Sequence, residues 1–486
     1  MCSIFLRILS WIRRLGGIPL ERHLEFALSH SQDHRREDRA RGVESRMVVT
    51  RGPSPFAFYA VIVACGLGLG LVAGLPIVDG TLSELHLKGG LAMFIGSTTG
   101  MVGTFLALLM VILASRVPAL ERTLGQHGDI HWHRRLAPWP ISLISIHALF
   151  LTISYAEVSK RGLLKEVGVI VNTFPSMVTA TVALGMMVGI GIISVRQIRT
   201  RIPRESWWLI HLLIYAALIL SFAHEIALGP SFVGHPLTKL GWTIAWLLAG
   251  ALVVTYRIGF PLYRSIRHRL KVAEIRPEGP GVVSVILEGR HLERLAIAGG
   301  QFFEWRFMTR QMWWQAHPFT VSALPQPPYI RLTVQGVGNF SRAVGHVKVG
   351  TSVAIEGPYG SFTTFARRRS RVLFIAGGVG VTAVRSLLED LPLKSRPLVV
   401  LRASSEEDLI LVNEVEELVR IRKGEVHRLI GSRDAVRLDS IVKLVPDMAK
   451  RDVYISGSEA FVRDATAMAR HAGVEAQAIH QEAYSI

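Results

Sequence analysis

The sequence predicts a multi-domain membrane protein with a six-helix transmembrane bundle, then an antiparallel β-barrel, then a doubly wound α/β domain. Its 486 residues are 50% hydrophobic and 19% charged, whereas soluble chains carry roughly 25% charged residues. Six long apolar stretches occupy the first half. After residue 270, short segments rich in Val, Ile and Leu are separated by Gly and Pro, which predicts the barrel. From residue 371 such segments alternate with helical patterns, which predicts the α/β domain.

Four segments follow from this organisation: a basic arm, the bundle, the barrel and the α/β domain, over 1–54, 55–262, 263–368 and 369–486. The arm mixes apolar and basic positions, and Arg7 interrupts the unbroken apolar run that a secretory signal needs. An amphipathic helix on the membrane surface and an unstructured basic arm are both compatible with this pattern.

Each apolar stretch is long enough to cross a bilayer, which needs about 20 residues per helix. The predicted spans are 55–78, 91–115, 136–156, 167–195, 207–228 and 241–260. Loops on the side of both termini carry 13 basic residues, against 5 in the opposite loops. The positive-inside rule therefore predicts a multi-pass protein of the cell membrane with both termini in the cytoplasm. The asymmetry explains most of the net charge of +18, so we expect no nucleic-acid partner.

Four histidines are distributed over two of the spans. His133 and His147 flank the third span, 14 residues apart, and His211 and His224 lie in the fifth, 13 apart. Ionisable groups at membrane depth are costly and usually functional. Each pair is separated by roughly 20 Å along its helix, so two such helices can hold two stacked metal centres. Neutral imidazole is a good axial ligand of haem iron.

We therefore expect His133 to face His211 on the inner side and His147 to face His224 on the outer side. Fourteen residues are close to four turns, but 13 residues place His211 and His224 off a common face of an ideal helix. The alternative for any single histidine is an ordinary packed or hydrogen-bonded residue of the bundle core.

The barrel region contains a candidate phosphate-binding turn. The run from Gln335 to Ala343 combines a strand end, glycines, a hydroxyl and a helical start, and includes Gly338, Ser341 and Arg342. Free backbone N–H groups at such a turn favour an anion. An ordinary surface loop is the alternative.

A second glycine-rich turn follows the apolar strand Val372–Ala376 and precedes a helix at 381–391. This strand–turn–helix unit predicts a site for a dinucleotide pyrophosphate at Gly377, Gly378, Gly380 and Thr382. The next predicted strand, Leu398–Arg402, ends beside Ser404. Arg402 and Ser404 can bind a 2′-phosphate, which favours NADPH over NADH, the alternative being a solvated loop.

The order of these motifs resembles the NADPH oxidase / ferric reductase superfamily over about residues 90–486. The motifs are the four histidines, His317-Pro318-Phe319-Thr320, the Gly/Ser turn, and Glu356-Gly357-Pro358-Tyr359-Gly360. The resemblance implies FAD, two b-type haems and NADPH as cofactors. It implies flavin contacts from the run that ends at Ser322, namely His317, Pro318, Phe319, Thr320 and Ser322. It implies phosphate contacts from Gly338 and Ser341, with Arg342 facing the pyrophosphate.

The chain departs from the family pattern at one position near the nicotinamide. The family has Cys-Gly-Pro where this chain has Ser456-Gly457-Ser458. Gly457 remains available for cofactor binding, and Ser456 becomes a candidate catalytic residue in place of the cysteine. The resemblance also makes Tyr484 a catalytic candidate that covers the flavin, although a strand end packed on the domain edge would explain it too.

The function implied is a transmembrane oxidoreductase that takes electrons from cytoplasmic NADPH to an external acceptor. Ferric iron in a chelate, dioxygen and a redox protein are all compatible acceptors. The alternative is a membrane sensor or anchor with vestigial cofactor domains. A transporter is less compatible, because the spans are expected to lack the acidic residues of a proton-coupled carrier.

Overall fold

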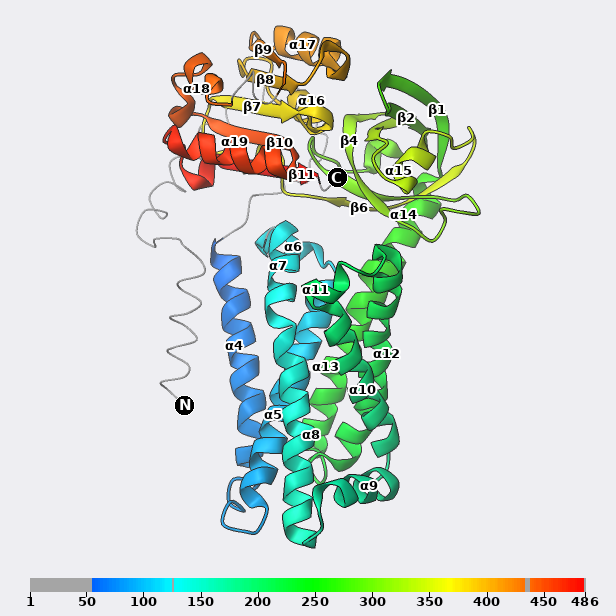
Figure 1. The fold of residues 1–486 in the computed structure, drawn as a ribbon, viewed down its shortest axis with the longest axis vertical. Helices are drawn as coiled ribbons and strands as arrows, with labels where there is room; N and C mark the ends of the chain where they lie inside the picture. Colours follow the sequence, from blue (N-terminus) through cyan, green and yellow to red (C-terminus); the bar gives the residue numbers. More distant parts are fainter. Residues whose placement is uncertain (1–54, 125, 433–437, 485–486) are drawn as a thin grey trace. The chain divides into compact units, whose positions relative to one another are not determined.

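The computed structural model describes residues 55–124, 126–432 and 438–484. The arm predicted over 1–54 lies outside these ranges. Within them, six helices are long and apolar enough to cross a membrane, which confirms the predicted six spans (Figure 1). The protein is a multi-pass membrane protein. The spans are formed by α4 (Pro55–Val78), α5 (Gly90–Ala114), α7 (Gln126–Leu136) with α8 (Pro138–Ser159), α10 (Met177–Ser194), α12 (Arg204–Leu228) and α13 (Pro236–Val253).

The predicted fourth span, 167–195, is wrong at its start. Helix α9 (Leu163–Thr173) ends before Pro175, and α10 begins after it. A proline restricts the residue before it to extended backbone, so Phe174 leaves the helix at ψ 142°. Ser176 then adopts a left-handed conformation with φ +61°. The span is therefore α10 alone, and α9 is a separate short helix.

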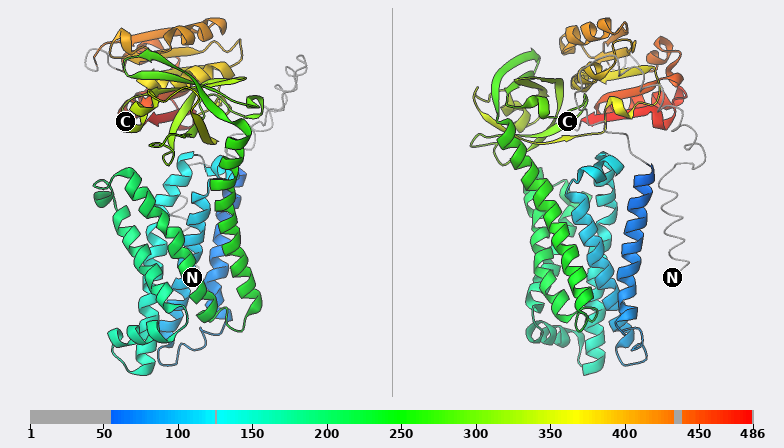
Figure 2. Two further views of the ribbon diagram at one scale, coloured as in Figure 1. Left: turned by 90° about the vertical axis from the view of Figure 1, so that its right-hand side faces the viewer. Right: turned by 180° about the vertical axis from the view of Figure 1, so that it is seen from behind.

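The other short helices lie at the ends of the spans. They are α6 (Pro118–Leu124), α11 (Arg196–Arg199) and α14 (Phe260–His268). Between α13 and α14 the backbone forms a π-helical turn, η2 (Val254–Gly259), so the last helical run continues without a break to His268. The views in Figure 2 show the long helices of the bundle running side by side.

The first sheet is a closed barrel of six antiparallel strands in the order β1-β2-β5-β4-β3-β6. Pairing of Leu270 with Val353 joins β1 to β6 and closes it. The interior is apolar, with Trp305 and Phe303 at 0% exposure, as expected for alternating strands. The elements are β1 (Leu270–Gly279), β2 (Val282–Glu288), β3 (Phe302–Phe307), β4 (His317–Gln326), β5 (Tyr329–Gln335), α15 (Asn339–Val344) and β6 (Ser352–Tyr359).

The second sheet has five parallel strands in the order β11-β10-β7-β8-β9. The strand order reverses between β7 and β10, and ligands of open α/β sheets bind at such a switch point, beyond the carboxyl ends of the strands. The strands are β7 (Val372–Gly377), β8 (Leu398–Ala403), β9 (Glu425–Ile430), β10 (Asp452–Ser458) and β11 (Ile479–Tyr484). The helices are α16 (Val381–Asp390), α17 (Val412–Ile421), α18 (Ser440–Leu444) and α19 (Glu459–His471).

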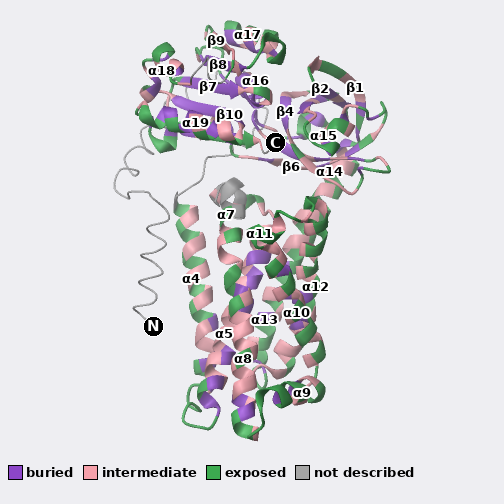
Figure 3. Ribbon diagram, viewed as in Figure 1, coloured by how far each residue is buried: buried purple, intermediate pink, exposed green. Residues whose placement is uncertain are grey.

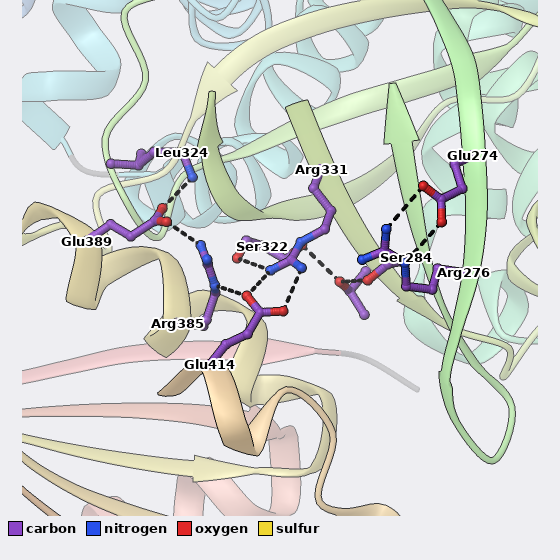
Figure 4. Close-up of polar contacts among 10 residues, drawn as sticks. Glu274, Arg276, Ser284, Ser322, Leu324, Arg331, Arg385, Glu389 and Glu414 are labelled. Atoms are coloured by element: carbon purple, nitrogen blue, oxygen red, sulfur yellow. Dashed lines mark hydrogen bonds and ion pairs between the residues drawn. The ribbon is translucent and has the colours of Figure 1, made fainter. Parts of the chain in front are cut away.

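An ion-pair network joins the barrel to the helices of the second sheet (Figure 4). The guanidinium of Arg331 on β5 donates to both carboxylate oxygens of Glu414 on α17, at 2.8 Å each. Arg385 on α16 donates to the same carboxylate at 2.8 Å and forms an ion pair with Glu389 at 2.6 Å. Glu389 in turn accepts from the backbone N–H of Leu324 at 2.6 Å. The network fixes α16, and with it the glycine-rich turn at its start, against strand β4.

Candidate functional site

The four histidines form two pairs inside the bundle. The ring centres of His133 and His211 lie 6.2 Å apart, and those of His147 and His224 lie 6.4 Å apart. The pairing expected from depth is therefore present in the structure. It forms even though 13 residues separate His211 from His224, because α7 and α8 bring one imidazole to each of them.

The separation within each pair fits one metal atom held between two imidazoles. A metal–nitrogen bond is about 2 Å long and the ring centre lies about 1 Å beyond the nitrogen, so two axial imidazoles have centres about 6 Å apart. In the described part of the chain no three His, Cys, Asp or Glu side chains converge on one point. The histidines thus suit a centre that takes two protein ligands and its remaining ligands from a macrocycle, as bis-His haem does.

Neighbouring groups orient the imidazoles. Nδ1 of His147 lies 2.8 Å from the carbonyl oxygen of Gly96 on α5, which leaves Nε2 free to act as a ligand. A Cβ on Gly100 would lie 2.5 Å from that same Nδ1, so only glycine leaves room for the ring. The ring of His211 stacks on Trp207 at 4.9 Å, and its Nδ1 lies 3.4 Å from Ser194 Oγ.

Glu157, Glu205 and Glu225 lie within the spans, contrary to the expectation of spans without acidic groups. Glu225 on α12 follows His224 directly and is bonded by Trp242 Nε1 at 3.0 Å and by Ser221 Oγ at 3.3 Å. The carboxylate is thus held among polar partners beside a histidine pair. The argument against a transporter from missing acidic residues is wrong, and the paired histidines are the stronger argument.

The predicted flavin run follows strand β3 in the chain and itself forms the start of strand β4. The His317 ring stacks on Phe340 of α15 with centres 3.8 Å apart. Burial, together with the positive charge of Arg204, lowers the pKa of His317 to about 4, so the imidazole is neutral at pH 7. Pro318 is exposed and Thr320 is buried. Phe319, between them, packs against the barrel core, so the alternation of the strand points Pro318 and Thr320 away from the barrel interior.

Ser322, the last residue of the run, is buried on the outer face of the barrel wall. Its hydroxyl contacts Thr333, whose neighbours Leu332 and Val334 both face the barrel core. Ser322 is 0% exposed, and its hydroxyl accepts a hydrogen bond from Thr333 Oγ1 at 2.8 Å. Thr333 shares a second bond of 2.8 Å with Ser284. The Ser322 hydroxyl is thus already engaged by another side chain of the barrel wall.

The Gly/Ser turn precedes the short helix α15. The backbone N–H of Gly338 donates to Ser341 Oγ at 2.9 Å, and Arg342 donates to Asn339 Oδ1 at 3.0 Å. Gly338, Ser341 and Arg342 are therefore together at one exposed helix start, with the guanidinium at the protein surface.

A cleft of about 910 Å³ lies at the switch point of the second sheet. Gly377 and Gly378 at the end of β7 line it, as do Arg402 and Ser404 after β8, and Tyr484 at the end of β11. The sequence-predicted nucleotide residues thus meet in one cleft, where an open parallel sheet binds its ligands.

Three other predicted residues lie behind the wall of this cleft. A Cβ on Gly380 would lie 2.2 Å from the carbonyl oxygen of Ser456, so glycine allows α16 to start against strand β10. Thr382 Oγ1 donates to the carbonyl of Val379 at 2.8 Å. Gly457 faces the ring of Phe461, which a Cβ would approach to 2.7 Å. These residues shape the turn rather than line the cleft.

The substitution of Ser458 for the family proline has a local structural role. Its hydroxyl accepts a hydrogen bond from the Phe461 N–H and caps α19. Ser456 is 0% exposed, and its hydroxyl is a neighbour of the Tyr484 phenol. The position of the family cysteine is therefore occupied by a smaller polar group inside the site.

Arg402 is held by backbone carbonyls. Its guanidinium donates to Ser432 O at 2.8 Å and to Ala403 O. Ser404 is exposed beside it. These contacts fix the cation at the rim of the cleft.

Tyr484 connects the two sheets. It ends the edge strand β11, and its hydroxyl lies 3.1 Å from Thr320 Oγ1 on β4. The two interpretations of this tyrosine are thus compatible, because the strand end on the sheet edge also reaches the flavin run. Burial, with a smaller contribution from Glu482, raises the pKa of Tyr484 to about 12.

Glu482 was not among the predicted site residues. It pairs with Ser456 across β10 and β11, and it is 8% exposed. Burial raises the pKa of Glu482 to about 8. The carboxyl lies two residues before Tyr484 on the same strand. An acidic residue within the last strand of the sheet domain is the sequence signal that could have indicated Glu482.

Comparison with known proteins agrees with this arrangement. A family model described as the ferric reductase like transmembrane component matches residues 99–222, and one described as the FAD-binding domain matches residues 269–363. The chain has the architecture of the ferric reductase / NADPH oxidase superfamily. The first match contains His133, His147 and His211, and the second contains the flavin run and the Gly/Ser turn.

Individual relatives cover parts of the chain. It is 22% identical over 363 residues to a probable ferric reductase transmembrane component of Candida albicans, which covers 70% of this chain and 51% of that protein. It is 26% identical over 184 residues to a glycine betaine monooxygenase reductase subunit of Pseudomonas aeruginosa, which covers 34% of this chain and 50% of that protein. The chain thus spans about half the length of the curated relatives it matches.

Among solved structures, the FAD/NAD-binding domain of a nitric oxide dioxygenase from Vibrio cholerae covers 45% of this chain and 99% of that domain. Its sequence identity is 21% and its TM-score is 0.38, a likeness too distant to carry an argument. The transmembrane and FAD-binding matches together show the domain combination of a ferric reductase-type flavoprotein.

Proposed function

We propose that this protein carries electrons from cytoplasmic NADPH, by way of FAD and two b-type haems, to an acceptor on the other side of the membrane. The observation that carries the proposal is the presence of two pairs of imidazoles in one helix bundle. The ring centres within each pair lie about 6 Å apart. Two histidine pairs at different depths of one bundle suit electron transfer across the membrane better than one isolated centre.

His133 and His211 are assigned to the inner haem, and His147 and His224 to the outer haem. The carbonyl of Gly96 contacts Nδ1 of His147, which leaves Nε2 of the ring as the atom for the iron. Neutral imidazole on both sides of the iron gives a low-spin electron-transfer centre.

On the flavin side, this chain supplies a flat surface and fixed polar groups. The run from His317 to Thr320 is assigned to the isoalloxazine and ribityl, and Gly338, Ser341 and Arg342 to the phosphates. When bound, FAD converts the two-electron chemistry of NADPH into the one-electron chemistry of haem iron. The neutral His317 ring, stacked on Phe340, keeps the flavin face free of an extra positive charge.

In the cleft of the second sheet, Gly377 and Gly378 are assigned to the pyrophosphate, and Arg402 with Ser404 to the 2′-phosphate of NADPH. A guanidinium suits a phosphate because it is planar and permanently charged. Ser456 and Tyr484 are assigned to the place where nicotinamide meets the flavin, and the Tyr484 hydroxyl lies 3.1 Å from Thr320 Oγ1.

The sidedness rests on the distribution of arginines. The connections that contain Arg134, Arg196 and Arg257 would face the cytoplasm, with both termini and the two sheet domains, proposed as 263–368 and 369–486. The basic arm over 1–54 is assigned to the same side. The acceptor is ferric iron in a chelate, dioxygen or a redox protein.

The experiment is a spectrum of the purified protein in bilayer nanodiscs. A low-spin b-type spectrum that NADPH plus FAD reduces without oxygen is expected, with two components of different potential. Fully folded protein without porphyrin absorbance would overturn the proposal and favour a sensor or anchor with vestigial cofactor domains. Reduction of ferric chelate without oxygen, compared with superoxide formation in air, then identifies the acceptor.

A further inference from the structure

Two carboxylates of the barrel lie directly opposite each other on neighbouring strands, so their negative charges need compensating cations. Glu304 on β3 and Glu356 on β6 are cross-strand partners in the register. Like charges directly opposite on neighbouring strands destabilise a sheet. Both side chains are 15% exposed, and burial raises the pKa of Glu304 above its ordinary range. Without cations, this pair would favour protonation or separation of the two strands.

The compensating cations come from the membrane bundle. Arg116 follows α5 in a left-handed conformation with φ +56°. Its guanidinium lies 3.3 Å from Glu304 and 3.6 Å from Glu356, and 4.6 Å above the ring of Tyr359. Each nitrogen of the planar fork thus meets a different strand of the barrel.

The second cation is Arg257, which lies in the π-helical turn η2 and bonds to Glu356. Tyr359 also donates to this carboxylate, at 2.7 Å. Single π-turns inside helices occur frequently at functional sites. Arginines from two different helices of the bundle therefore converge on two adjacent strands of the barrel.

The cluster lies between the two proposed cofactor sites. In the barrel, Glu304 pairs with Pro318 and the next residue pairs with His317, so the carboxylate is one strand away from the flavin run. In the bundle, the backbone of Met110 is a polar neighbour of His133, and Met110 lies on α5 six residues before Arg116.

We propose that Arg116 and Arg257 are positioning residues, which hold the flavin run in a fixed register with the His133–His211 pair through Glu304 and Glu356. This inference rests on the proposed function. Ion pairs taken out of water add little net stability, but they can specify one arrangement among several. A cluster with two cations, two carboxylates and an aromatic ring restricts both the distance and the rotation between the barrel and the bundle.

The test separates the two electron-transfer steps by rapid-mixing spectroscopy of the cofactor-loaded full chain. For Arg116→Ala we expect flavin reduction by NADPH at the wild-type rate. Haem reduction is expected to slow about tenfold or more, because misplacement by 1 Å is costly. Arg276→Ala is the matched control, since Arg276 makes an exposed ion pair with Glu274 on β1 of the same barrel and is expected to leave both steps unchanged.

A second measurement requires no cofactor. Spin labels at Thr200→Cys on the bundle and Glu293→Cys on the barrel, in a chain with Cys2 and Cys65 replaced by Ser, report the distance between the two parts. A single narrow distribution is expected, broadened by Arg116→Ala and narrowed again by the charge exchange Arg116→Glu with Glu304→Arg. If Arg116→Ala does not fold, Arg116→Lys, which retains the charge without the planar fork, is expected to give the same changes to a smaller extent.

Unchanged distance distributions together with wild-type haem reduction in these variants would overturn the inference. That result differs from failure of the proposed function, in which the wild-type protein itself would contain no haem. Equal slowing of flavin reduction and haem reduction would also overturn it, because that pattern indicates general damage to the barrel.

Discussion

The membrane bundle and the nucleotide-binding sheet use the same apolar residues in opposite ways. In strand β7, Val372, Leu373, Phe374 and Ile375 are all 0% exposed, whereas Leu67 and Leu71 on α4 are about 70% exposed. Figure 3 shows this contrast, with buried residues concentrated in the sheets and exposed ones along the helices of the bundle. Apolar side chains of the bundle thus lack protein neighbours because lipid covers them. A histidine in such apolar surroundings has few polar groups to bond with, so imidazoles that face each other there indicate a functional site.

The two regions also build their sites differently. In the bundle, four side chains from two spans make the site, and their depths follow from helical rise alone. In the sheet domain, the cleft depends on backbone turns from β7, β8, β10 and β11. Together these strands extend over more than 100 residues of the sequence, from Val372 to Tyr484. Changes of side chain should therefore disable the bundle site, whereas changes of backbone geometry should disable the cleft.

The largest expected effect is at the bundle site. His147→Ala or His224→Ala should remove the outer haem, because one imidazole cannot replace two axial ligands. We expect the haem content per protein to fall by about half. The rate of electron transfer to the external acceptor should fall more than about 100-fold, which is more than the loss of a group that only hydrogen-bonds to a ligand causes. Pyridine haemochrome analysis and a chelate-reduction assay measure this. His235→Ala, at an exposed position, is the control, and retention of both haems in His147→Ala would refute the assignment.

The next effect tests the backbone of the cleft. Gly380→Ala brings a Cβ to 2.2 Å from the Ser456 carbonyl, so α16 must shift away from β10. We expect the KM for NADPH in flavin reduction to rise about 100-fold, as a shift near 1 Å can cause.

Gly378→Ala serves as its comparison. Gly378 has φ +55° but open space around its Cβ position, so only backbone strain of about 1–2 kcal/mol is expected. A Gly380→Ala variant that binds NADPH as tightly as Gly378→Ala would contradict the role of close packing.

A smaller effect concerns Glu482. Burial raises its pKa to about 8, whereas an unfolded Glu titrates near 4.3. The neutral carboxyl therefore contributes stability that is fully present below about pH 4.3 and is lost as the pH rises through 8. Glu482→Gln should remove this dependence and raise the unfolding midpoint at pH 9 by about 2–4 °C. Thermal unfolding between pH 5 and 9 measures it, with the exposed Glu459→Gln as control; parallel curves for Glu482→Gln and wild type would exclude the effect.

The smallest effect concerns the network of Figure 4. Hydrogen bonding to Arg331, then the charges of Arg331 and Arg385, lower the pKa of Glu414. Its stabilisation is present above about pH 4.3 and is lost as the pH falls through the lower folded value. Because Glu414 is 36% exposed, we expect Arg331→Ala to cost about 1 kcal/mol at pH 7 and less at pH 3. Urea unfolding at both pH values checks this. Arg420→Ala, which removes an exposed pair with Glu417, should have almost no effect.

Much of the organisation could be predicted from the sequence because it depends on local periodicity. Long apolar runs predicted six spans, and the depths of His133, His147, His211 and His224 predicted which imidazoles would pair. The fourth span shows the limit, since hydropathy continues through Pro175 while the backbone cannot.

The sequence by itself determined which segments cross the membrane, which histidines share a depth in two pairs, and where glycines interrupt the strands. Each of these depends on residues close together in the chain. Only the tertiary structure showed that Tyr484 reaches Thr320, that Ser322 is buried on the outer face of the barrel wall, and that Glu482 is buried beside Ser456. It alone brought Arg116 and Arg257 onto Glu304 and Glu356. These contacts join residues from different elements, and strand register and helix packing, which no local pattern encodes, decide them.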